Sequence, residues 1–189
     1  MNHLGLLVVG RSHESHWAWE ICELEELARL HSGYLTGRQL DIWTLMRDGV
    51  SQSEIARRLH ISRQAVNQLI QTIPIRITEA LNDASKLNGV EPKIIDSAKG
   101  VMLGYSRELQ TDVVITMHPE TGLRIWYQHS LGRCKICPDK KQCKSRLMKM
   151  VDAWGVALTT KEKDLDPSKL ASLVFSKAFG TEYRSEISN

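Results

Sequence analysis

The 189-residue sequence contains no apolar stretch that approaches about 18 residues, so no helix is expected to span a membrane. The longest apolar run, residues 4–10, is too short for such a helix. It also lacks a basic segment before it and a small-residue cleavage site after it, so we expect a cytoplasmic protein and no secretory signal. Four cysteines are too few for a disulfide-stabilised scaffold of this length. There is no internal repeat, no low-complexity tract and no glycine-rich phosphate-binding loop.

Composition and charge predict a folded protein that can meet a polyanion through local basic clusters. Hydrophobic residues make up 42% of the chain and charged residues 25%, which are ordinary values for a globular protein and exclude a mostly disordered one. The net charge is only +3, but it is unevenly distributed. Residues 1–31 contain two basic and five acidic residues, whereas residues 133–149 contain seven basic residues and one acidic residue. Such clusters decide polyanion binding more than a small overall excess does.

Residues 35–88 read as consecutive helices with clear start signals. Thr36 with Gln39 and Ser51 with Glu54 have the spacing of capping boxes, and Ser62 is a third N-cap. These signals predict helices at about 36–48, 51–59 and 62–72. Proline removes a backbone donor, so Pro74 is expected to stop or kink the third helix, with another helix over 75–87.

The rest of the chain predicts a second unit. The pattern favours a helix over 90–110, an antiparallel hairpin over 112–129 around a Pro-Glu-Thr-Gly turn, and helices over 144–154 and 166–179. We therefore expect a mainly α fold with a small β-hairpin (α+β), in which a tri- or tetrahelical helix-turn-helix domain precedes a metal-binding C-terminal domain. The predicted segments are an N-terminal helical or uncertain part (1–33), the helix-turn-helix domain (34–88), the C-terminal domain (89–180) and a frayed tail (181–189).

The segment 51–73 has the packing pattern of a helix-turn-helix. Ala56 is small enough to let two helices cross closely, Ile61 fills the turn, and Val66 faces inward. Amide side chains read adenine edges, and arginine reads guanine or binds phosphate. The outward face of the second helix offers side chains of both kinds. The first helix of such a unit crosses the DNA backbone. The predicted DNA-binding residues are Arg57, Arg58, Ser62, Arg63, Gln64, Asn67, Gln68 and Gln71. A plain helical hairpin with a solvated polar face is the alternative.

Residues 35–70 resemble the helix-turn-helix of LuxR-type response regulators, region 4 of sigma factors and archaeal Tfx-type regulators. The resemblance rests on the Leu-Thr-x-Arg-Gln opening at residues 35–39, the Glu-Ile-Ala block with Ile-Ser at residues 54–62, and Ala65-Val66. The opening and the last block are most similar to the Tfx-type group. The resemblance implies a DNA-binding transcription regulator, and it does not extend to the hairpin or the cysteines.

Three of the four cysteines lie within ten residues. Cys134, Cys137 and Cys143, with His129 at the end of the predicted hairpin, have a spacing that predicts one metal centre. Zinc would take a tetrahedral Cys3His set. A [4Fe–4S] cluster is the other candidate, because the last two cysteine spacings resemble those of iron–sulfur DNA-repair glycosylases, although Tyr127 stands where those proteins have a further cysteine. Unmetallated thiols, or Cys22 as a remote ligand, remain open.

These features together predict a DNA-binding transcription regulator that is not an enzyme. Its C-terminal metal site would stabilise or sense, its partner would be double-stranded DNA, and it would act as a homodimer without membrane contact. The alternatives are an iron–sulfur nucleic-acid enzyme such as a nuclease, for which Glu91-Pro92-Lys93 is the only suggestive match, and a helical protein–protein adaptor. His118 is expected to face solvent, and Trp126-Tyr127 to belong to the core of the hairpin.

Overall fold

The computed structural model of the protein describes residues 33–128 and 133–180. Its elements, in chain order, are α2 (Gly37–Arg47), α3 (Gln52–Arg58), α4 (Arg63–Leu87), β1 (Val90–Asp96), β2 (Val101–Ser106), β3 (Thr111–His118), β4 (Gly122–Tyr127), α5 (Lys140–Trp154), α6 (Thr160–Lys163) and α7 (Pro167–Phe179). The predicted α+β class is confirmed. The segments predicted at 1–33 and 181–189 lie almost entirely outside the described residues. No helix in the described ranges is long and apolar enough to cross a membrane.

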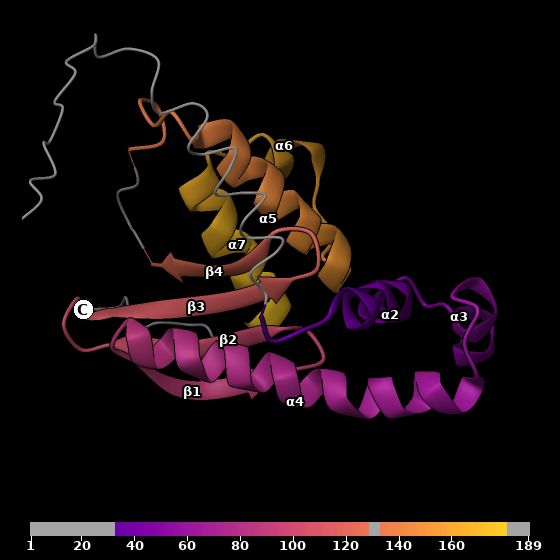
Figure 1. The fold of residues 1–189 in the computed structure, drawn as a ribbon. Helices are drawn as coiled ribbons and strands as arrows, with labels where there is room; N and C mark the ends of the chain where they lie inside the picture. Colours follow the sequence, from indigo (N-terminus) through magenta and orange to yellow (C-terminus); the bar gives the residue numbers. More distant parts are fainter. Residues whose placement is uncertain (1–32, 129–132, 181–189) are drawn as a thin grey trace, which may run out of the picture.

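The strands form one antiparallel sheet in the order β1-β2-β3-β4, with helices on both faces. Figure 1 shows α4 along one face and α5 and α7 along the other, while α2 and α3 lie beyond the ends of the strands, around the first half of α4. The expected small hairpin is therefore only the second half of a four-stranded sheet, in which β3 and β4 flank the predicted Pro-Glu-Thr-Gly turn.

The predicted start signals of the first three helices are confirmed. The Thr36 hydroxyl accepts a hydrogen bond from the Gln39 backbone N–H, and the Gln39 side chain accepts one from the Thr36 N–H, which completes a capping box. The Ser62 hydroxyl caps α4 by accepting a hydrogen bond from the Ala65 backbone N–H. The box predicted at Ser51 is only half formed, because the carboxylate of Glu54 binds two arginines instead of returning to the N-cap.

Pro74 does not stop the third helix, so the separate helix predicted over 75–87 is wrong. One helix, α4, runs through it for 25 residues, a length of about 38 Å. Proline removes only its own N–H, so the helix loses one bond to Ile70, while Ile73 and Ile77 on either side are almost completely buried. Apolar packing on both sides of the proline outweighs the lost bond.

The helix predicted over 90–110 is wrong, because this segment forms β1, a turn and β2. The apolar residues that suggested helical periodicity alternate between the two faces of a strand. Met102 joins the α4 side of the sheet, whereas Val101 and Leu103 join the α5–α7 side. Gly104 also favours a strand over a helix in this segment, because a Cβ atom there would lie 2.6 Å from a methyl carbon of Val90 on the neighbouring strand.

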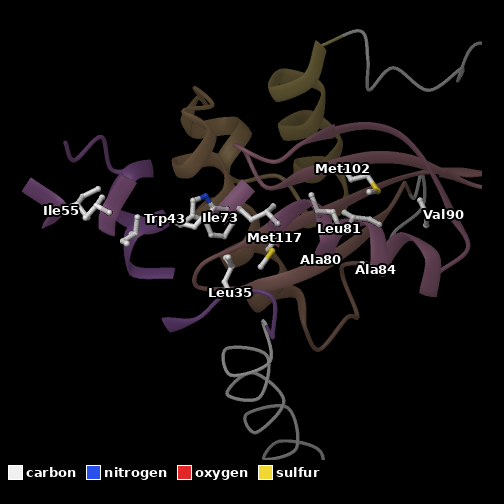
Figure 2. Close-up of a cluster of buried hydrophobic side chains, with 14 of the residues drawn as sticks. Leu35, Trp43, Ile55, Ile73, Ala80, Leu81, Ala84, Val90, Met102 and Met117 are labelled. Carbon is white, nitrogen blue, oxygen red and sulfur yellow. The ribbon is translucent and has the colours of Figure 1, made fainter. Parts of the chain in front are cut away.

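Two buried clusters hold the layers together. The first joins α2, α3 and α4 to one face of the sheet and includes the residues labelled in Figure 2, which come from both sides of the domain boundary predicted at 88–89. The second joins the opposite face to α5 and α7, with Trp126 packed edge-on against Phe175. The core role expected of Trp126 and Tyr127 is thus confirmed. That the boundary separates independently folding units stays a prediction.

The C-terminal helices end largely where the sequence signals place them. α5 terminates at Gly155, whose φ of +64° is left-handed, and Pro167 occupies the first turn of α7. α5 begins at Lys140, four residues earlier than predicted, so Cys143 lies in its first turn. The short α6 was not predicted, although Thr159 and Glu162 form a complete capping box in front of it.

Gly100 occupies the tightest backbone position of the fold. Its φ is +67°, and a Cβ atom there would lie 2.4 Å from the carbonyl oxygen of Met117 and 3.1 Å from the indole ring of Trp43. Gly155 has nearly the same φ, +64°, but nothing lies within 4 Å of its Cβ position. The two glycines therefore separate the cost of backbone strain from that of a steric clash.

We predict that Gly100→Ala lowers the free energy of unfolding by more than about 2 kcal/mol, whereas Gly155→Ala costs about 1 kcal/mol. Both substitutions force alanine into the left-handed region, but only the first drives a methyl group into backbone. Urea denaturation followed by circular dichroism measures both losses. Equal losses would show that the turn at residue 100 opens easily.

Candidate functional site

The exposed face of the first half of α4 has an unusual composition. The stretch that runs from α3 through this half of α4, residues 55–78, contains four arginines, at positions 57, 58, 63 and 76, and no aspartate or glutamate. The side chains on this face are all exposed, and within the described part of the chain they make no hydrogen bond or ion pair: Arg63, Gln64, Asn67, Gln68 and Gln71. The face is therefore positive, polar and available.

The second half of α4 differs in charge pattern. Arg76 pairs with Glu79 at 2.8 Å, and Lys86 lies 3.8 Å from Asp83, which are the helical pairs that ordinary surface helices use. Asp83 also accepts a hydrogen bond from the Tyr34 hydroxyl at 2.8 Å. The acid-free region is thus confined to the half of α4 that packs against α2 and α3.

A buried framework holds this face in position. Ile55 and Val66 are fully buried between α3 and α4, with Ala56 beside them, as the sequence predicted. Gln39 is also buried, and its amide donates to the Thr72 hydroxyl at 3.2 Å, which links the start of α2 to the middle of α4. These contacts leave the backbone of α4 little freedom relative to the two shorter helices.

Arg57 and Arg58 lie at the end of α3, next to the start of α4, and both are exposed. They share one carboxylate: Arg57 binds both oxygens of Glu54, at 2.7 and 2.8 Å, and Arg58 binds one of them at 2.7 Å. The hydrogen bonds from Arg57 and Arg58 hold the pKa of Glu54 at about 2. Glu54 is therefore ionised at neutral pH and neutralises part of the positive charge at this end of the face.

The three clustered cysteines occupy the loop before α5 and its first turn. Cys134 and Cys143 are half-buried and Cys137 is exposed, and all three are free thiols. Burial raises the pKa of Cys143, and the neighbouring Cys134 and Cys137 raise it further. Cys134 donates to the Ser168 hydroxyl on α7 at 3.4 Å.

The three cysteines do not form a complete set of metal ligands within the part of the chain that the structure describes. Among the residues that the structure describes, no three His, Cys, Asp or Glu side chains are grouped as a metal site. His129, the expected fourth ligand, lies outside the described residues, as does Cys22. Lys140 nearby is already engaged, since it pairs with Asp166 at 2.7 Å.

The residues that suggested a nuclease are engaged in separate pairs. Glu91 pairs with Arg107 across the β1–β2 hairpin, and Lys93 pairs with Asp112 at 3.0 Å. Glu91, Lys93 and Asp112 lie on strands of the sheet, and Arg107 lies in the turn after β2. Asp83, the nearest acidic residue before this segment, lies on α4 instead. The structure thus distributes the Glu91-Pro92-Lys93 segment and Asp83 over different elements and different partners.

His118 was expected to face solvent, but it is half-buried against α2 and α5. Its Nδ1 accepts a hydrogen bond from the Glu120 backbone N–H at 3.1 Å. Burial, followed by the nearby Arg47 guanidinium, lowers the pKa of His118 to about 4. The imidazole is therefore neutral at physiological pH. This burial could not be predicted from the sequence, because the elements that bury His118 are distant in the chain.

No protein family, no curated protein and no solved structure matches this chain.

We predict that the folded protein loses stability as the pH falls from about 6.5 towards 4. In that range the unfolded state binds a proton at His118 that the folded state does not, so the free energy of unfolding rises with pH. The contribution of this partly exposed group is about 1–2 kcal/mol. Denaturation midpoints at several pH values should show a shallower slope for His118→Asn. His60→Asn, at an exposed turn position, is the control, and the same slope in all three proteins would contradict the assignment.

Proposed function

We propose that the protein is a DNA-binding transcription regulator whose α3–turn–α4 unit is a helix-turn-helix. The observation that carries this proposal is the exposed, acid-free face of α4 between residues 63 and 71, which presents four amide side chains and one arginine. Solvated surface helices usually carry glutamate and lysine. A face of unengaged amides is instead suited to reading base edges in a major groove.

The arrangement around this face suits a duplex. Residues near the N-terminus of a recognition helix reach base edges, and Arg63, Gln64 and Asn67 occupy the first two turns of α4. Arg57 and Arg58 flank these turns from α3 and would contact phosphates, which position the protein without reading sequence. The resemblance to Tfx-type and LuxR-type regulators supports the same reading of residues 35–70.

A homodimer in the cytoplasm is part of this proposal. One recognition helix covers few base pairs, and specific binding usually needs two half-sites about one turn apart. The edge strand β1 exposes Ile94 and Ile95, each more than a third accessible, and α4 exposes Ile75. These side chains are our candidates for the contact between subunits, and sedimentation of the full chain checks the expected dimer.

Two other functions make different predictions for the same protein. A nucleic-acid enzyme would cleave DNA when Mg²⁺ or Mn²⁺ is added, and we expect no cleavage. An adaptor would not bind duplex DNA at all, whereas a regulator should bind with an affinity that falls steeply as salt rises. A salt series on duplex DNA therefore tests the proposal directly.

We further propose that Cys134, Cys137 and Cys143 bind one metal centre, zinc or [4Fe–4S], with His129 as the candidate fourth ligand. A soft thiolate set suits either centre. The clustering of the three free thiols in the loop before α5 and in its first turn supports the proposal. Binding would draw the sulfurs together and fix the loop between β4 and α5, so the centre would stabilise the C-terminal layer or sense its own loss.

We predict that Gln64→Ala and Asn67→Ala each weaken binding to a selected cognate site by about 1–3 kcal/mol and hardly change binding to random DNA. Their amides would contact base edges, which carry the sequence information. Fluorescence anisotropy on both kinds of duplex measures the difference. Asn82→Ala, on the second half of α4, is the control and should bind like the wild type. Equal losses on both duplexes would assign these residues to positioning alone.

We predict that Glu54→Gln tightens non-specific DNA binding about two- to fivefold at low salt, because it releases Arg57 and Arg58 for phosphates. The gain should vanish as salt rises. Glu79→Gln, which removes a comparable helical pair with Arg76 beyond Pro74, should change nothing. If both variants bind alike, α3 does not face the DNA backbone.

We predict that Cys137→Ser removes most of the bound metal from anaerobically purified protein. The loss of one thiolate leaves the site incomplete, and metal binding is coupled to the folding of the loop. Elemental analysis gives the metal content, and the visible absorption spectrum distinguishes an iron–sulfur cluster from colourless zinc. Cys22→Ser and His129→Ala test the two candidates for the fourth ligand. Full metal content in Cys137→Ser would refute the proposed centre.

A further inference from the structure

Two adjoining cavities lie where the C-terminal end of α2, the β3–β4 turn and α5 meet, a junction that can be located by the labels in Figure 1. One, of about 190 Å³, is lined by Arg47 and Asp48 at the C-terminal end of α2, by His118 at the end of β3, and by Asp152 on α5. Its carboxylates, from Asp48, Glu120 and Asp152, outnumber its cations, from Arg47 and Lys149. The other, of about 180 Å³, lies between the turn and α5 and is lined by Thr121, Arg124 and Arg146. Glu120 and Lys149 line both cavities, so they form the wall between them.

Positive charge outweighs negative charge in the second cavity. Its lining contains Arg124, Arg146 and Lys149 against the single carboxylate of Glu120. Lys149 and Glu120 form an ion pair of 2.6 Å, and both are substantially exposed, at 38% and 57% of their side chains. Such an exposed pair contributes little to stability, so an incoming anion can replace Glu120 beside Lys149 at small cost.

Each cavity contains a buried polar atom that lacks a partner. In the first it is Nη1 of Arg47, a guanidinium held over the ring of Trp43 at 5.4 Å and desolvated enough to lower its pKa. In the second it is the hydroxyl oxygen of Thr121. Leaving such groups unsatisfied is costly, and the cost is higher when the group is charged. Both can donate a hydrogen bond, so both favour a ligand with acceptor oxygens.

We infer that these joined cavities bind a small organic anion of the carboxylate or phosphate class, with its acidic oxygens on Lys149, Arg47 and the Thr121 hydroxyl. Guanidinium and ammonium groups in a partly desolvated site are suited to such oxyanions. The volumes fit a small metabolite and are too small for a polymer segment. An anion in this position would also hinder Glu120 from returning to Lys149.

The position of the site gives it a regulatory consequence, which rests on the proposed function. Arg47 belongs to α2, which packs on the DNA-reading half of α4, and Lys149 belongs to α5 on the opposite face of the sheet. An anion that contacts both would join the DNA-binding helices to the C-terminal layer. Its binding energy would differ between relative positions of these two parts, which is the requirement for coupling.

The test uses the full-length protein and four probe anions: inorganic phosphate, pyrophosphate, malonate and citrate. Titration calorimetry and thermal unfolding are run at constant ionic strength set with sodium chloride. We expect at least one probe to bind saturably, and the class that binds identifies the ligand as a phosphate or a carboxylate. If none of the four binds saturably, the inference is overturned.

Matched variants locate the binding. Lys149→Gln should weaken it at least tenfold, whereas Lys177→Gln, which breaks a similar ion pair with Glu162 at 2.8 Å, should leave it unchanged. Thr121→Val should weaken binding about fivefold without destabilising the anion-free protein. Glu120→Gln should tighten binding, because it removes the competing carboxylate. Equal losses in both lysine variants, or weaker binding by Glu120→Gln, would refute the site.

A DNA-binding measurement with and without the bound probe separates the two proposals. A change in DNA affinity that is lost in Lys149→Gln supports the coupling. An anion that binds saturably without changing DNA affinity would show that the coupling is wrong while the site stands. A protein that binds no DNA would refute the proposed function, and the calorimetry would still decide the anion site.

Discussion

The burial of one continuous stripe along α4 is the constraint on which the rest of the structure depends. Val66 packs against α3, Ile73 and Ile77 lie on either side of Pro74, and Leu81 and Ala84 pack on the sheet. Each buried side chain of this kind contributes about 1.5–3 kcal/mol, so the stripe outweighs the loss of one helical hydrogen bond at proline. The helix therefore joins the α2–α3 unit to the sheet as a single rod.

The helix α4 connects the proposed DNA-binding face to the sheet and the C-terminal helices. Its first half carries the proposed DNA-reading face, and its second half rests on a sheet whose opposite face supports α5 and α7. The cysteine loop precedes α5, and the proposed anion site joins α5 to α2 through Lys149 and Arg47. Metal and anion would thus act on the same helix, α5, and reach the DNA-reading face through packed elements, without a flexible linker in between.

Local chemistry was predictable from the sequence, and long-range pairing was not. The box at Thr36, the cap at Ser62, the turn before Gly122 and the helix end at Gly155 each depend on residues within a few positions, and each is confirmed. The helix prediction for residues 90–110 was wrong because the apolar spacing there fits a helix as well as a strand. Only the close packing of Gly104 against Val90 and the turn at Gly100 decide between them.

The same distinction applies to the candidate sites. The proposed DNA-reading residues of α4 lie within nine positions of one helix, so periodicity alone placed them on a common exposed face. The anion site was not foreseen, since Arg47, Thr121 and Lys149 are brought together by three elements far apart in the chain. The cluster of cysteines was visible from spacing, whereas the contact of Cys134 with Ser168 on α7 required the tertiary fold.

Native-state hydrogen exchange along α4 tests whether the helix behaves as one continuous unit through Pro74, because it reports the opening free energy of each amide on both sides of the proline. If α4 is one rod, the buried-stripe amides around residues 66–73 and 77–84 should exchange with similar opening free energies and respond together to denaturant. If the first half exchanges orders of magnitude faster than the second, Pro74 is a hinge between two units, and the rigid connection from the sheet to the DNA-reading face does not exist.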